Sequence, residues 1–293
     1  MKVLVTGGAG FVARYLCAEL VAAGHEVVLS DVTDSEAPNF IKADLSNRAE
    51  MLDLVDSTRP DAIVHLGAIS FVPDAERSLE RLRQVNLGGT EALLEAVRRS
   101  VPNVRFVFAS TAMVLGGALA PYAAMKLAAE GAVALFALEG HSAVIVRPAN
   151  HTGPGQSEKF VVPALVRQAL DIKAGKRDLF AVGNLDSVRY FTDVRDVVRA
   201  YRMLLEDKEA SGVYSLCSDC RMRIAQLLGR IAEIVGVRPI FEVDEKLWRP
   251  TDVAQVIDAT RIKAIGWRAE MPIDKTIRDM ADYMAKTLSS RQK

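Results

Sequence analysis

A glycine-rich segment between a strand and a helix constrains the fold of this chain more than any other feature. Residues 6–13 read TGGAGFVA, follow the apolar run at 3–5 and open a helical pattern. Gly7 permits a tight turn, Gly10 lets the backbone approach a pyrophosphate, and the helix N-terminus offers free N–H groups to an anion. Because both flanking elements are in place, the segment predicts a dinucleotide site rather than a simple turn. The residues that it places at the cofactor are Gly7, Gly10, Phe11 and Val12.

An acidic residue ends the next predicted strand, at 26–30, about 20 residues further on. Asp31 can accept both ribose hydroxyls of NAD and would repel the 2′-phosphate of NADP, and no arginine follows within several residues. We therefore expect NAD as the cofactor, with NADP as the less favoured form; the alternative is that Asp31 only caps a turn. Asp44 and Leu45 follow a short third strand and are placed to meet the adenine, although a helix cap explains Asp44 equally well.

Strands and helices continue to alternate through the first half of the 293 residues. Further β-branched, apolar runs lie at 63–66, 105–109 and 144–146, with helical patterns between them. Strands joined by helices of this length require right-handed crossovers, which build a parallel sheet covered on both faces. The predicted fold class is α/β, with a Rossmann-like doubly wound parallel sheet.

The alternation ends near residue 148. Longer helical patterns then alternate with isolated short strands, the helices at 160–174, 193–206 and 224–235 and one strand at 213–216. We expect a dinucleotide-binding domain over 1–150 and a smaller α/β substrate-binding lobe over 151–293, and leave open the exchange of a strand or helix between the two lobes.

The charge balance limits the partners of this chain. Lys plus Arg and Asp plus Glu both number 37, so the formal net charge is zero and no global basic field attracts nucleic acid or an anionic membrane. The apolar runs stay short of the ~18 residues of a membrane span, and the N-terminal run is too short for a signal peptide. Cys217 and Cys220 have no further Cys or His ligands close in sequence, so we expect no metal. The expected location is the cytoplasm.

Tyr122 and Lys126 stand four residues apart in a helical pattern, so a phenol and an ammonium share one face of a helix. A nearby ammonium lowers a tyrosine pKa from ~10 toward the working pH. Such a phenol can exchange a proton with a carbinol oxygen during hydride transfer. The pair is common by itself, but it gains weight behind a dinucleotide loop and just after a strand that leads into Thr111.

With these residues the chain resembles the extended short-chain dehydrogenases/reductases of the NAD-dependent epimerase/dehydratase family, which modify nucleotide sugars. The resemblance rests on 6–13, on 122–126 and on the order of strands, and it runs through nearly the whole chain. In the second half, four segments are similar to the family's reductases of GDP-4-keto-6-deoxy-mannose: 147–156, 182–185, 189–196 and 249–252. The resemblance implies an NAD(P)-dependent oxidoreductase that acts on a nucleotide sugar.

The resemblance also implies roles for the predicted site residues. Thr111 would hydrogen-bond the substrate carbonyl oxygen as charge develops there, Tyr122 would donate the proton, and Lys126 would bind the nicotinamide ribose and lower the tyrosine pKa. Around the substrate it implies Asn150 on the sugar, Arg189 and Arg249 on the diphosphate, and Asp252 on the ribose of the nucleotide. Arginine suits bidentate phosphate recognition, and an exposed salt bridge is the alternative for each arginine.

Two departures from the family pattern bear on the reaction. The segment 112–121 is shorter than the family's usual loop, with Leu115 where a tyrosine is common, which removes part of the roof over the substrate. Dehydratases follow the threonine with an Asp–Glu pair, because eliminating water needs an extra acid and base. Ala112 and Met113 stand there instead and cannot move a proton, which argues against 4,6-dehydration.

Three functions remain after this exclusion. The first is NAD(P)H-dependent reduction of a 4-keto-6-deoxy nucleotide sugar that is GDP-linked. The second is an NAD-dependent nucleotide-sugar 4-epimerase, which would keep its cofactor bound. The third is a non-catalytic protein that binds a dinucleotide or a nucleotide sugar.

The alanine-rich helical pattern at 120–138 is apolar nearly all round, so it needs cover on more than one side. Leu127 and Phe136 are expected to cover the sheet. We expect the opposite side to pair with a second copy of the chain around a two-fold axis, giving a homodimer. The alternative is cover by another helix of the same chain.

Overall fold

The computed structural model describes residues 1–71, 77–116, 120–248 and 256–290, and the chain divides into two compact units. The first unit takes Met1–Pro148, Val198–Leu216 and Ile257–Trp267. The second takes Ala149–Val197, Cys217–Val256 and Arg268–Lys293. The chain thus returns to the first unit twice after residue 148, and the division into domains at residue 150 stays a prediction.

A seven-stranded parallel sheet forms the centre of the first unit, in the order β11-β6-β5-β4-β1-β2-β3. The strands are β1 (Lys2–Thr6), β2 (Glu26–Asp31), β3 (Phe40–Lys42), β4 (Ala62–His65), β5 (Arg105–Ala109), β6 (Ala143–Pro148) and β11 (Gly212–Leu216). The strand order reverses between β1 and β4, which is the arrangement of a doubly wound sheet. The predicted Rossmann-like α/β fold class is confirmed.

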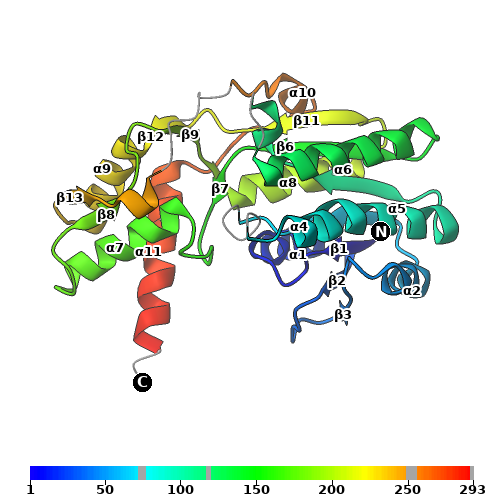
Figure 1. Cartoon of the computed structure of the whole chain (residues 1–293), viewed down its shortest axis with the longest axis horizontal. Coiled ribbons are helices and arrows are strands. Elements are labelled where there is room, and N and C mark those ends of the chain that lie inside the picture. Colours follow the sequence, from blue (N-terminus) through cyan, green and yellow to red (C-terminus); the bar gives the residue numbers. More distant parts are fainter. Residues whose placement is uncertain (72–76, 117–119, 249–255, 291–293) are drawn as a thin grey trace. The chain divides into compact units, whose positions relative to one another are not determined.

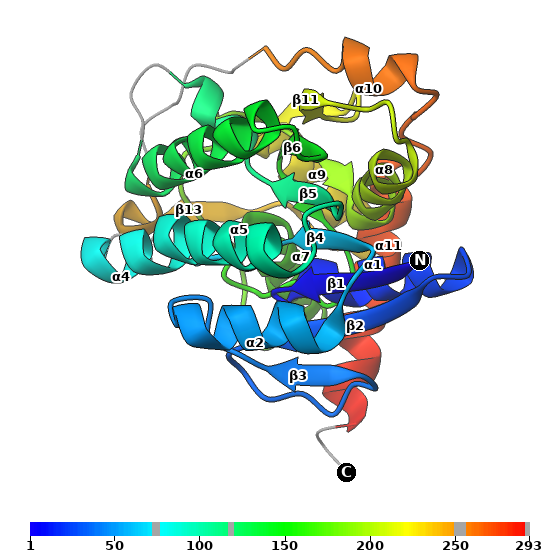
Figure 2. The same ribbon diagram turned by 90° about the vertical axis from the view of Figure 1, so that its right-hand side faces the viewer.

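Helices cover both faces of this sheet (Figures 1 and 2). Figure 2 shows α2 (Arg48–Thr58), α5 (Gly89–Ser100) and α6 (Pro121–Leu138) on one face, and α1 (Phe11–Ala22) with α8 (Val194–Glu206) on the other. Shorter elements complete the unit, namely α4 (Leu79–Arg83), the π-helical turn η1 (Gln84–Gly88), the 3₁₀ turn η2 (Ala112–Leu115) and α10 (Thr260–Ala264).

The strand predicted at 213–216 belongs to the first unit, which corrects its assignment to the isolated strands of the second lobe. It is β11, and all five of its residues pair with β6, Val213 opposite Ile145. Arg261 donates to the backbone oxygens of Val213 (2.8 Å) and Ser211 (2.9 Å) and stacks on the ring of Tyr214. The open edge of β6 offers unpaired N–H and C=O groups, and a four-residue pattern carries no signal for which edge it will pair with.

The core of the first unit lies between the sheet and the helices α2, α5 and α6. Phe106, Phe108 and Phe136 are fully buried in this unit. Phe136 covers the sheet as predicted, but the same prediction for Leu127 is wrong, because this side chain is 40% exposed. The inner face of α6 carries Lys126 and Glu130. Leu127 is the next residue after Lys126, so its side chain points about 100° away from this face around the helix axis.

Among the described residues, α6 is also the one helix that is long and apolar enough to cross a membrane. Length and composition carry little weight here, because the core helix of a folded domain passes the same test. Two ionisable side chains, Lys126 and Glu130, are buried on the face of α6 that packs against the sheet.

In the second unit, helices α7 (Val161–Lys173), α9 (Ile224–Val235) and α11 (Ile273–Ser290) enclose a separate apolar core. Three two-stranded ladders accompany them: β7 (His151–Thr152) with β10 (Thr192–Asp193), β9 (Val188–Tyr190) with β12 (Arg221–Arg223), and β8 (Phe180–Val182) with β13 (Phe241–Val243). A 3₁₀ turn, η3, spans Glu245–Leu247. The helices predicted at 160–174, 193–206 and 224–235 are α7, α8 and α9.

Local chemistry accounts for several helix ends. Asn47 caps α2 by accepting hydrogen bonds from the backbone N–H groups of Ala49 and Glu50. Gly236 ends α9 in the left-handed conformation, with φ +82°, which glycine adopts without steric cost. Both helix ends therefore lie at residues whose chemistry favours starting or stopping a helix.

Candidate active site

The glycine loop after β1 is packed so tightly that only backbone fits. Gly7 has φ +73°, and a Cβ there would lie 2.8 Å from the backbone nitrogen of Gly67. The Gly8 N–H donates to the Ser30 carbonyl (2.9 Å), and a Cβ on Gly8 would lie 2.8 Å from the Ser30 nitrogen. The loop is therefore held against both β2 and the segment after β4. Gly8 was not among the predicted cofactor residues, although its place in the motif is a signal.

The N-terminus of α1 follows this loop without a side-chain cap. Gly10 occupies the cap position, and the first turn, which contains Phe11 and Val12, carries no acidic residue. The N–H groups of an uncapped first turn and the helix dipole together favour an anion. This cradle of backbone fits the pyrophosphate of a dinucleotide.

Asp31 lies beside the loop, because β2 is the neighbour of β1 in the sheet. One carboxylate oxygen accepts a hydrogen bond from the Ala9 N–H (3.2 Å), and the other accepts one from the Thr33 N–H (3.0 Å). The side chain thus caps the turn after β2 and also faces the loop. In this geometry Asp31 can cap the turn and also accept the ribose hydroxyls of a cofactor.

Asp44 and Leu45 serve the local structure in ways that are visible here. Asp44 accepts hydrogen bonds from the Ser46 N–H (2.8 Å) and from the Arg81 guanidinium (3.2 Å). Although burial acts to raise it, the pKa of Asp44 is lowered by these partners. Leu45 packs so closely over Gly67 that a Cβ on this glycine would lie 2.5 Å from the leucine side chain. The turn-cap interpretation of Asp44 fits these contacts, and adenine contact stays a prediction.

The three predicted catalytic residues lie where β5 ends and α6 begins. The Lys126 ammonium donates to the Ala109 carbonyl at the end of β5 (2.7 Å) and lies 4.7 Å from the centre of the Phe108 ring. Thr111 follows two residues later and caps η2, its Oγ1 accepting from the Met113 N–H (3.2 Å). Tyr122 lies one turn before Lys126 on the buried face of α6. The fold therefore brings Lys126 to the strand end that leads into Thr111.

Burial dominates the titration of this pair. It raises the pKa of Tyr122 to about 12 and lowers the pKa of Lys126 to about 8, against the opposing charge of Glu130. The expected lowering of the Tyr122 pKa by Lys126 is not found in this structure, because removing the phenol from water favours its neutral form.

Glu130 is a buried charge that sequence analysis missed. It lies one turn after Lys126, accepts a hydrogen bond from the Ser110 hydroxyl and forms a bidentate pair with Arg147 of β6, whose Nε lies 2.9 Å from Oε1. The network joins α6 to the residue just before Thr111. An acidic residue four positions after the lysine, on the same face, was a signal that could have revealed it.

A second missed group is Asn86, in the π-helical turn η1. Its side chain accepts from the Ile69 N–H (2.8 Å) and donates to the Ile69 carbonyl (3.1 Å). Ile69 packs in the same apolar cluster as Tyr122. Asn86 thus holds one wall around the phenol, and π-turns of this kind are frequent at functional sites.

Of the predicted substrate residues, Asn150 and Arg189 belong to the second unit and are described within it. The Asn150 carbonyl accepts from the Thr192 N–H (3.0 Å), and its side chain is exposed. Arg189 lies on β9 opposite Met222 and donates to the Val188 carbonyl (2.9 Å). Arg249 and Asp252 lie outside the described residues.

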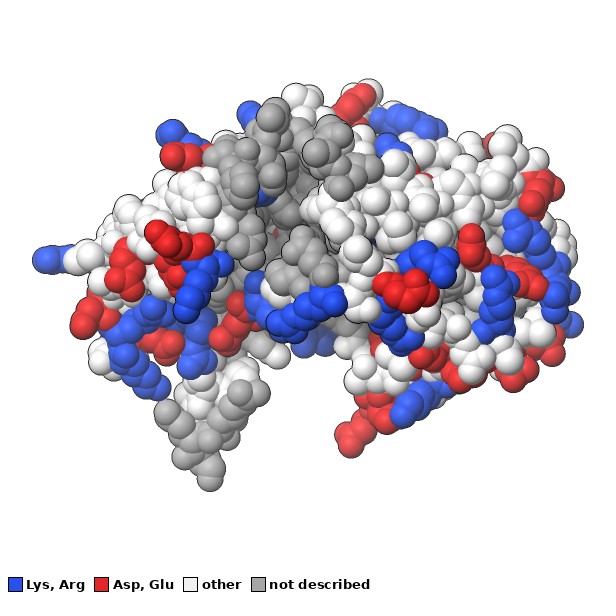
Figure 3. Space-filling view, in the orientation of Figure 1, with Lys and Arg blue, Asp and Glu red and all other residues white. Residues whose placement is uncertain are grey.

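Acidic and basic side chains are intermixed on the face drawn in Figure 3. Within the part of the chain that the structure describes, no group of three or more His, Cys, Asp or Glu side chains could hold a metal ion. Cys217 and Cys220 are not joined in a disulfide; the first is buried and the second half-buried.

The sequence model of the NAD dependent epimerase/dehydratase family matches residues 3–217, well over half of the chain. The chain belongs to this family. The resemblance stated from the sequence is thereby confirmed, and so are the enzyme class, an NAD(P)-dependent oxidoreductase, and a nicotinamide dinucleotide as its cofactor.

Relatives in the epimerase/dehydratase family cover nearly the whole chain. A GDP-6-deoxy-D-mannose reductase of Pseudomonas aeruginosa is 33% identical, over 94% of this chain and 95% of its own length. A GDP-6-deoxy-D-talose 4-dehydrogenase of Aggregatibacter actinomycetemcomitans is 30% identical, over 88% of each chain.

Solved structures of the family agree with the fold. RMD from Pseudomonas aeruginosa complexed with NADPH is similar with a TM-score of 0.86 and 31% identity, over 98% of this chain and 99% of its own. A UDP-glucose 4-epimerase of Thermus thermophilus in complex with NAD also gives a TM-score of 0.86, with 27% identity over 97% and 99% of the two chains.

Proposed function

We propose that this chain reduces the C4 keto group of a GDP-linked 6-deoxy nucleotide sugar with hydride from NAD(P)H. The observation that carries the proposal is the pairing of Tyr122 and Lys126 on one buried face of α6, with Lys126 bonded to the end of β5 just before Thr111. Ala112 and Met113 follow this threonine and supply neither acid nor base, which favours reduction over dehydration. The similarity to the Pseudomonas aeruginosa reductase supports the same substrate class.

The residues of the first unit would bind the cofactor and transfer the proton. The backbone at Gly7 and Gly10 and the first turn of α1, with Phe11 and Val12, would hold the pyrophosphate, and Asp31 the adenosine ribose, with Asp44 and Leu45 toward the adenine. The cofactor supplies the hydride when bound. Thr111 would hydrogen-bond the C4 oxygen of the substrate, and Tyr122 would donate the proton to that oxygen. Lys126 would bind the nicotinamide ribose.

The substrate residues of the second unit complete the proposal. Asn150 would line the sugar and Arg189 would bind the diphosphate, together with Arg249 and Asp252. The guanidinium of Arg189 offers the planar, charge-assisted hydrogen bonds that suit a diphosphate.

The test is turnover of GDP-4-keto-6-deoxy-mannose by the purified chain, followed through the nicotinamide absorbance with NADH and NADPH in parallel. We expect cofactor oxidation that depends on the sugar and is faster with the GDP-linked substrate than with UDP- or dTDP-linked ones. Absence of turnover with every 4-keto sugar, while these ligands still bind, would identify the non-catalytic alternative instead.

A nucleotide-sugar 4-epimerase is the second candidate, favoured by the likeness to an epimerase structure that holds NAD. Such an enzyme oxidises C4 and reduces the same carbon again, so it must retain its cofactor between the two steps. One NAD per chain in the protein as purified, with C4 inversion and no net cofactor consumption, would select this function over the reductase.

We also propose that the chain works as a homodimer in the cytoplasm. The outer face of α6 exposes an apolar stripe at Leu127, Leu135 and Leu138, of which Leu135 is 61% exposed. Exposed apolar side chains gathered on one helix face favour an interface over solvent, and a two-fold pairing would bury them. Light scattering behind size exclusion should give twice the 31.9 kDa of one chain.

A further inference from the structure

Two carboxylates are buried at the junction of β10 and α8 in the second unit. The side chains of Asp193 and Asp196 are both fully buried. A buried charge is costly unless it is paired and hydrogen-bonded, so the partners of these two groups show what holds the junction in place.

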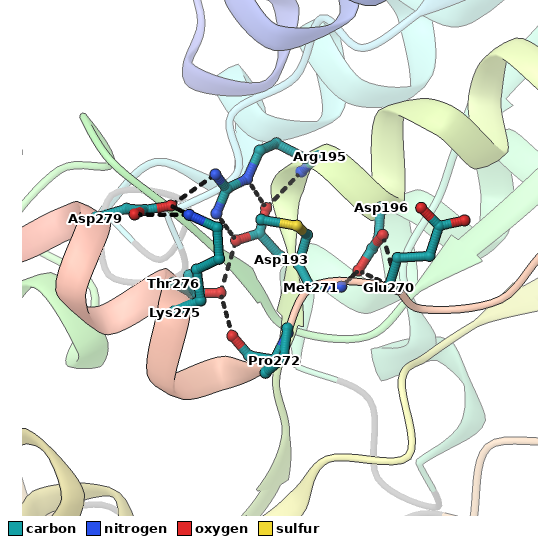
Figure 4. A network of polar contacts seen from close by, with 9 residues as sticks. All are labelled: Asp193, Arg195, Asp196, Glu270, Met271, Pro272, Lys275, Thr276 and Asp279. Carbon is teal, nitrogen blue, oxygen red and sulfur yellow. Dashed lines mark hydrogen bonds and ion pairs between the residues drawn. The ribbon is translucent and has the colours of Figure 1, made fainter.

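Asp193 is bound by Arg195 of α8 and by α11 (Figure 4). One oxygen accepts from the backbone N–H and the Nε of Arg195 (both 2.8 Å). The other accepts from Arg195 Nη2 (2.7 Å) and from the hydroxyl of Thr276 (2.6 Å). Arg195 extends the network to Asp279, one turn further along α11, at 2.7 Å.

Asp196 binds the segment that leads into α11. Its carboxylate accepts hydrogen bonds from the backbone N–H groups of Glu270 (3.1 Å) and Met271 (3.0 Å) (Figure 4). Both buried carboxylates therefore bind residues 270–279 to the start of α8. About 80 residues of sequence separate these two segments.

The strand held in this way is joined to the segments that carry two proposed substrate residues, to one by hydrogen bonds and to the other through the chain. Thr192 of β10 pairs with His151 of β7, and its N–H donates to the carbonyl of Asn150 (3.0 Å). Along the chain, β10 begins directly after Phe191, which follows β9 and its Arg189. A strand of two residues has few hydrogen bonds of its own, so its position depends on what anchors it.

We propose that the network of Asp193, Arg195, Thr276 and Asp279 positions the nucleotide-sugar site, with α11 clamping β10 so that the segments of Asn150 and Arg189 keep their binding geometry. These are positioning residues, because they act through β10 and the neighbouring backbone. The inference rests on the proposed function for the identity of the ligand. It assigns the C-terminal helix a part in substrate recognition.

The test compares variants of α11 that weaken the clamp with variants that spare it. Thr276→Val removes the hydroxyl that binds Asp193, and Asp279→Asn removes the charge that binds Arg195. Thr276→Ser keeps the hydroxyl and serves as the conservative rescue. Asp274→Asn is the matched control, since Asp274 lies on the same helix but pairs with the exposed Arg230 of α9.

Binding of GDP-mannose and of NADH is measured by calorimetry for each variant, together with the urea midpoint of unfolding. Thr276→Val and Asp279→Asn should weaken GDP-mannose binding by about tenfold and leave NADH binding within about twofold, since hydrogen bonds to charged groups are the stronger ones. Thr276→Ser and Asp274→Asn should bind GDP-mannose as the unaltered chain does.

The inference is overturned if the two clamp variants unfold more easily but bind GDP-mannose normally, because the network then only stabilises the fold. A parallel loss of GDP-mannose and NADH binding overturns it as well. So does an unaltered chain that binds no GDP-mannose. Turnover of the 4-keto sugar by the unaltered chain decides the proposed function separately, since these titrations need no reaction.

Discussion

Replacing Lys126 with methionine should change the stability of the cofactor-free protein, relative to the unaltered chain, more favourably at neutral pH than at higher pH. The side chain is 3% exposed, and burial lowers the pKa of its ammonium from 10.5 to about 8. Such a depression means that carrying the proton costs about 3 kcal/mol more in the folded than in the unfolded chain. Methionine has a similar length and no charge, so it removes this cost. It also leaves the Ala109 carbonyl without the ammonium as its donor, but this loss is the same at every pH below about 8 and does not produce the expected trend.

The sign of the pH dependence follows from the two pKa values. Below about pH 8 the amine is protonated in both states, and the full cost is present. Between about pH 8 and 10.5 the folded chain has lost the proton while the unfolded chain still binds it, so the stability of the unaltered protein rises with pH. Relative to Lys126→Met, the unaltered chain should gain about 2 kcal/mol between pH 7 and about pH 9.5.

Urea unfolding of the cofactor-free proteins measures the difference in unfolding free energy between Lys126→Met and the unaltered chain at several pH values. It is followed by tryptophan fluorescence, to which the buried Trp267 contributes. The highest pH used stays below the pKa of ~10 at which tyrosines of the unfolded chain ionise. Lys42→Met, at an exposed lysine paired with Asp34, is the control for the loss of a surface ammonium. The reasoning would be refuted if the free energy of unfolding of Lys126→Met minus that of the unaltered chain stayed constant or rose with pH.

Three further predictions concern the cofactor, the chemistry and the assembly. Asp31→Ser combined with Val32→Arg should shift the ratio of NADPH to NADH affinity by about tenfold or more; a native preference for NADPH in titrations would contradict the argument from Asp31. Tyr122→Phe should lower turnover by roughly 10²–10⁴-fold with NADH binding retained, and a variant that keeps most of its activity would show the site assignment to be wrong. Leu135→Glu should halve the mass seen by light scattering without loss of stability. Ala132→Glu, at a half-buried position, should halve the mass and also destabilise the chain. An unchanged mass for Leu135→Glu would place the interface elsewhere.

Most of the elements of the first unit were predictable because their signals are local. The runs at 26–30, 105–109 and 144–146 each hold three or more consecutive apolar residues, which is typical of strands buried on both faces, and they became β2, β5 and β6. The glycine loop was recognisable because a positive φ and a close backbone approach exclude a Cβ at fixed positions. The spacing of Tyr122 and Lys126 placed them on one helix face for the same local reason.

Long-range contacts account for what could not be predicted. Residues 213–216 show only that they form a strand, whereas the edge that they join depends on the unpaired side of β6. Leu127 and Phe136 are both apolar on an alanine-rich helix, so only packing decides which of them faces the sheet. Glu130 and Asp193 were missed because their partners, Ser110, Arg147 and Thr276, are distant in sequence.

The sequence by itself determined the α/β class and predicted the dinucleotide loop and the candidate catalytic side chains, because strand and helix periods, glycine sterics and i, i+4 spacing are properties of short segments. The tertiary structure decided how those side chains are charged and held. Burial, which no local pattern reveals, raises the pKa of Tyr122 and lowers that of Lys126, reversing the expectation for the pair. The clamp that α11 places on β10 likewise exists only once buried carboxylates find their partners across the fold.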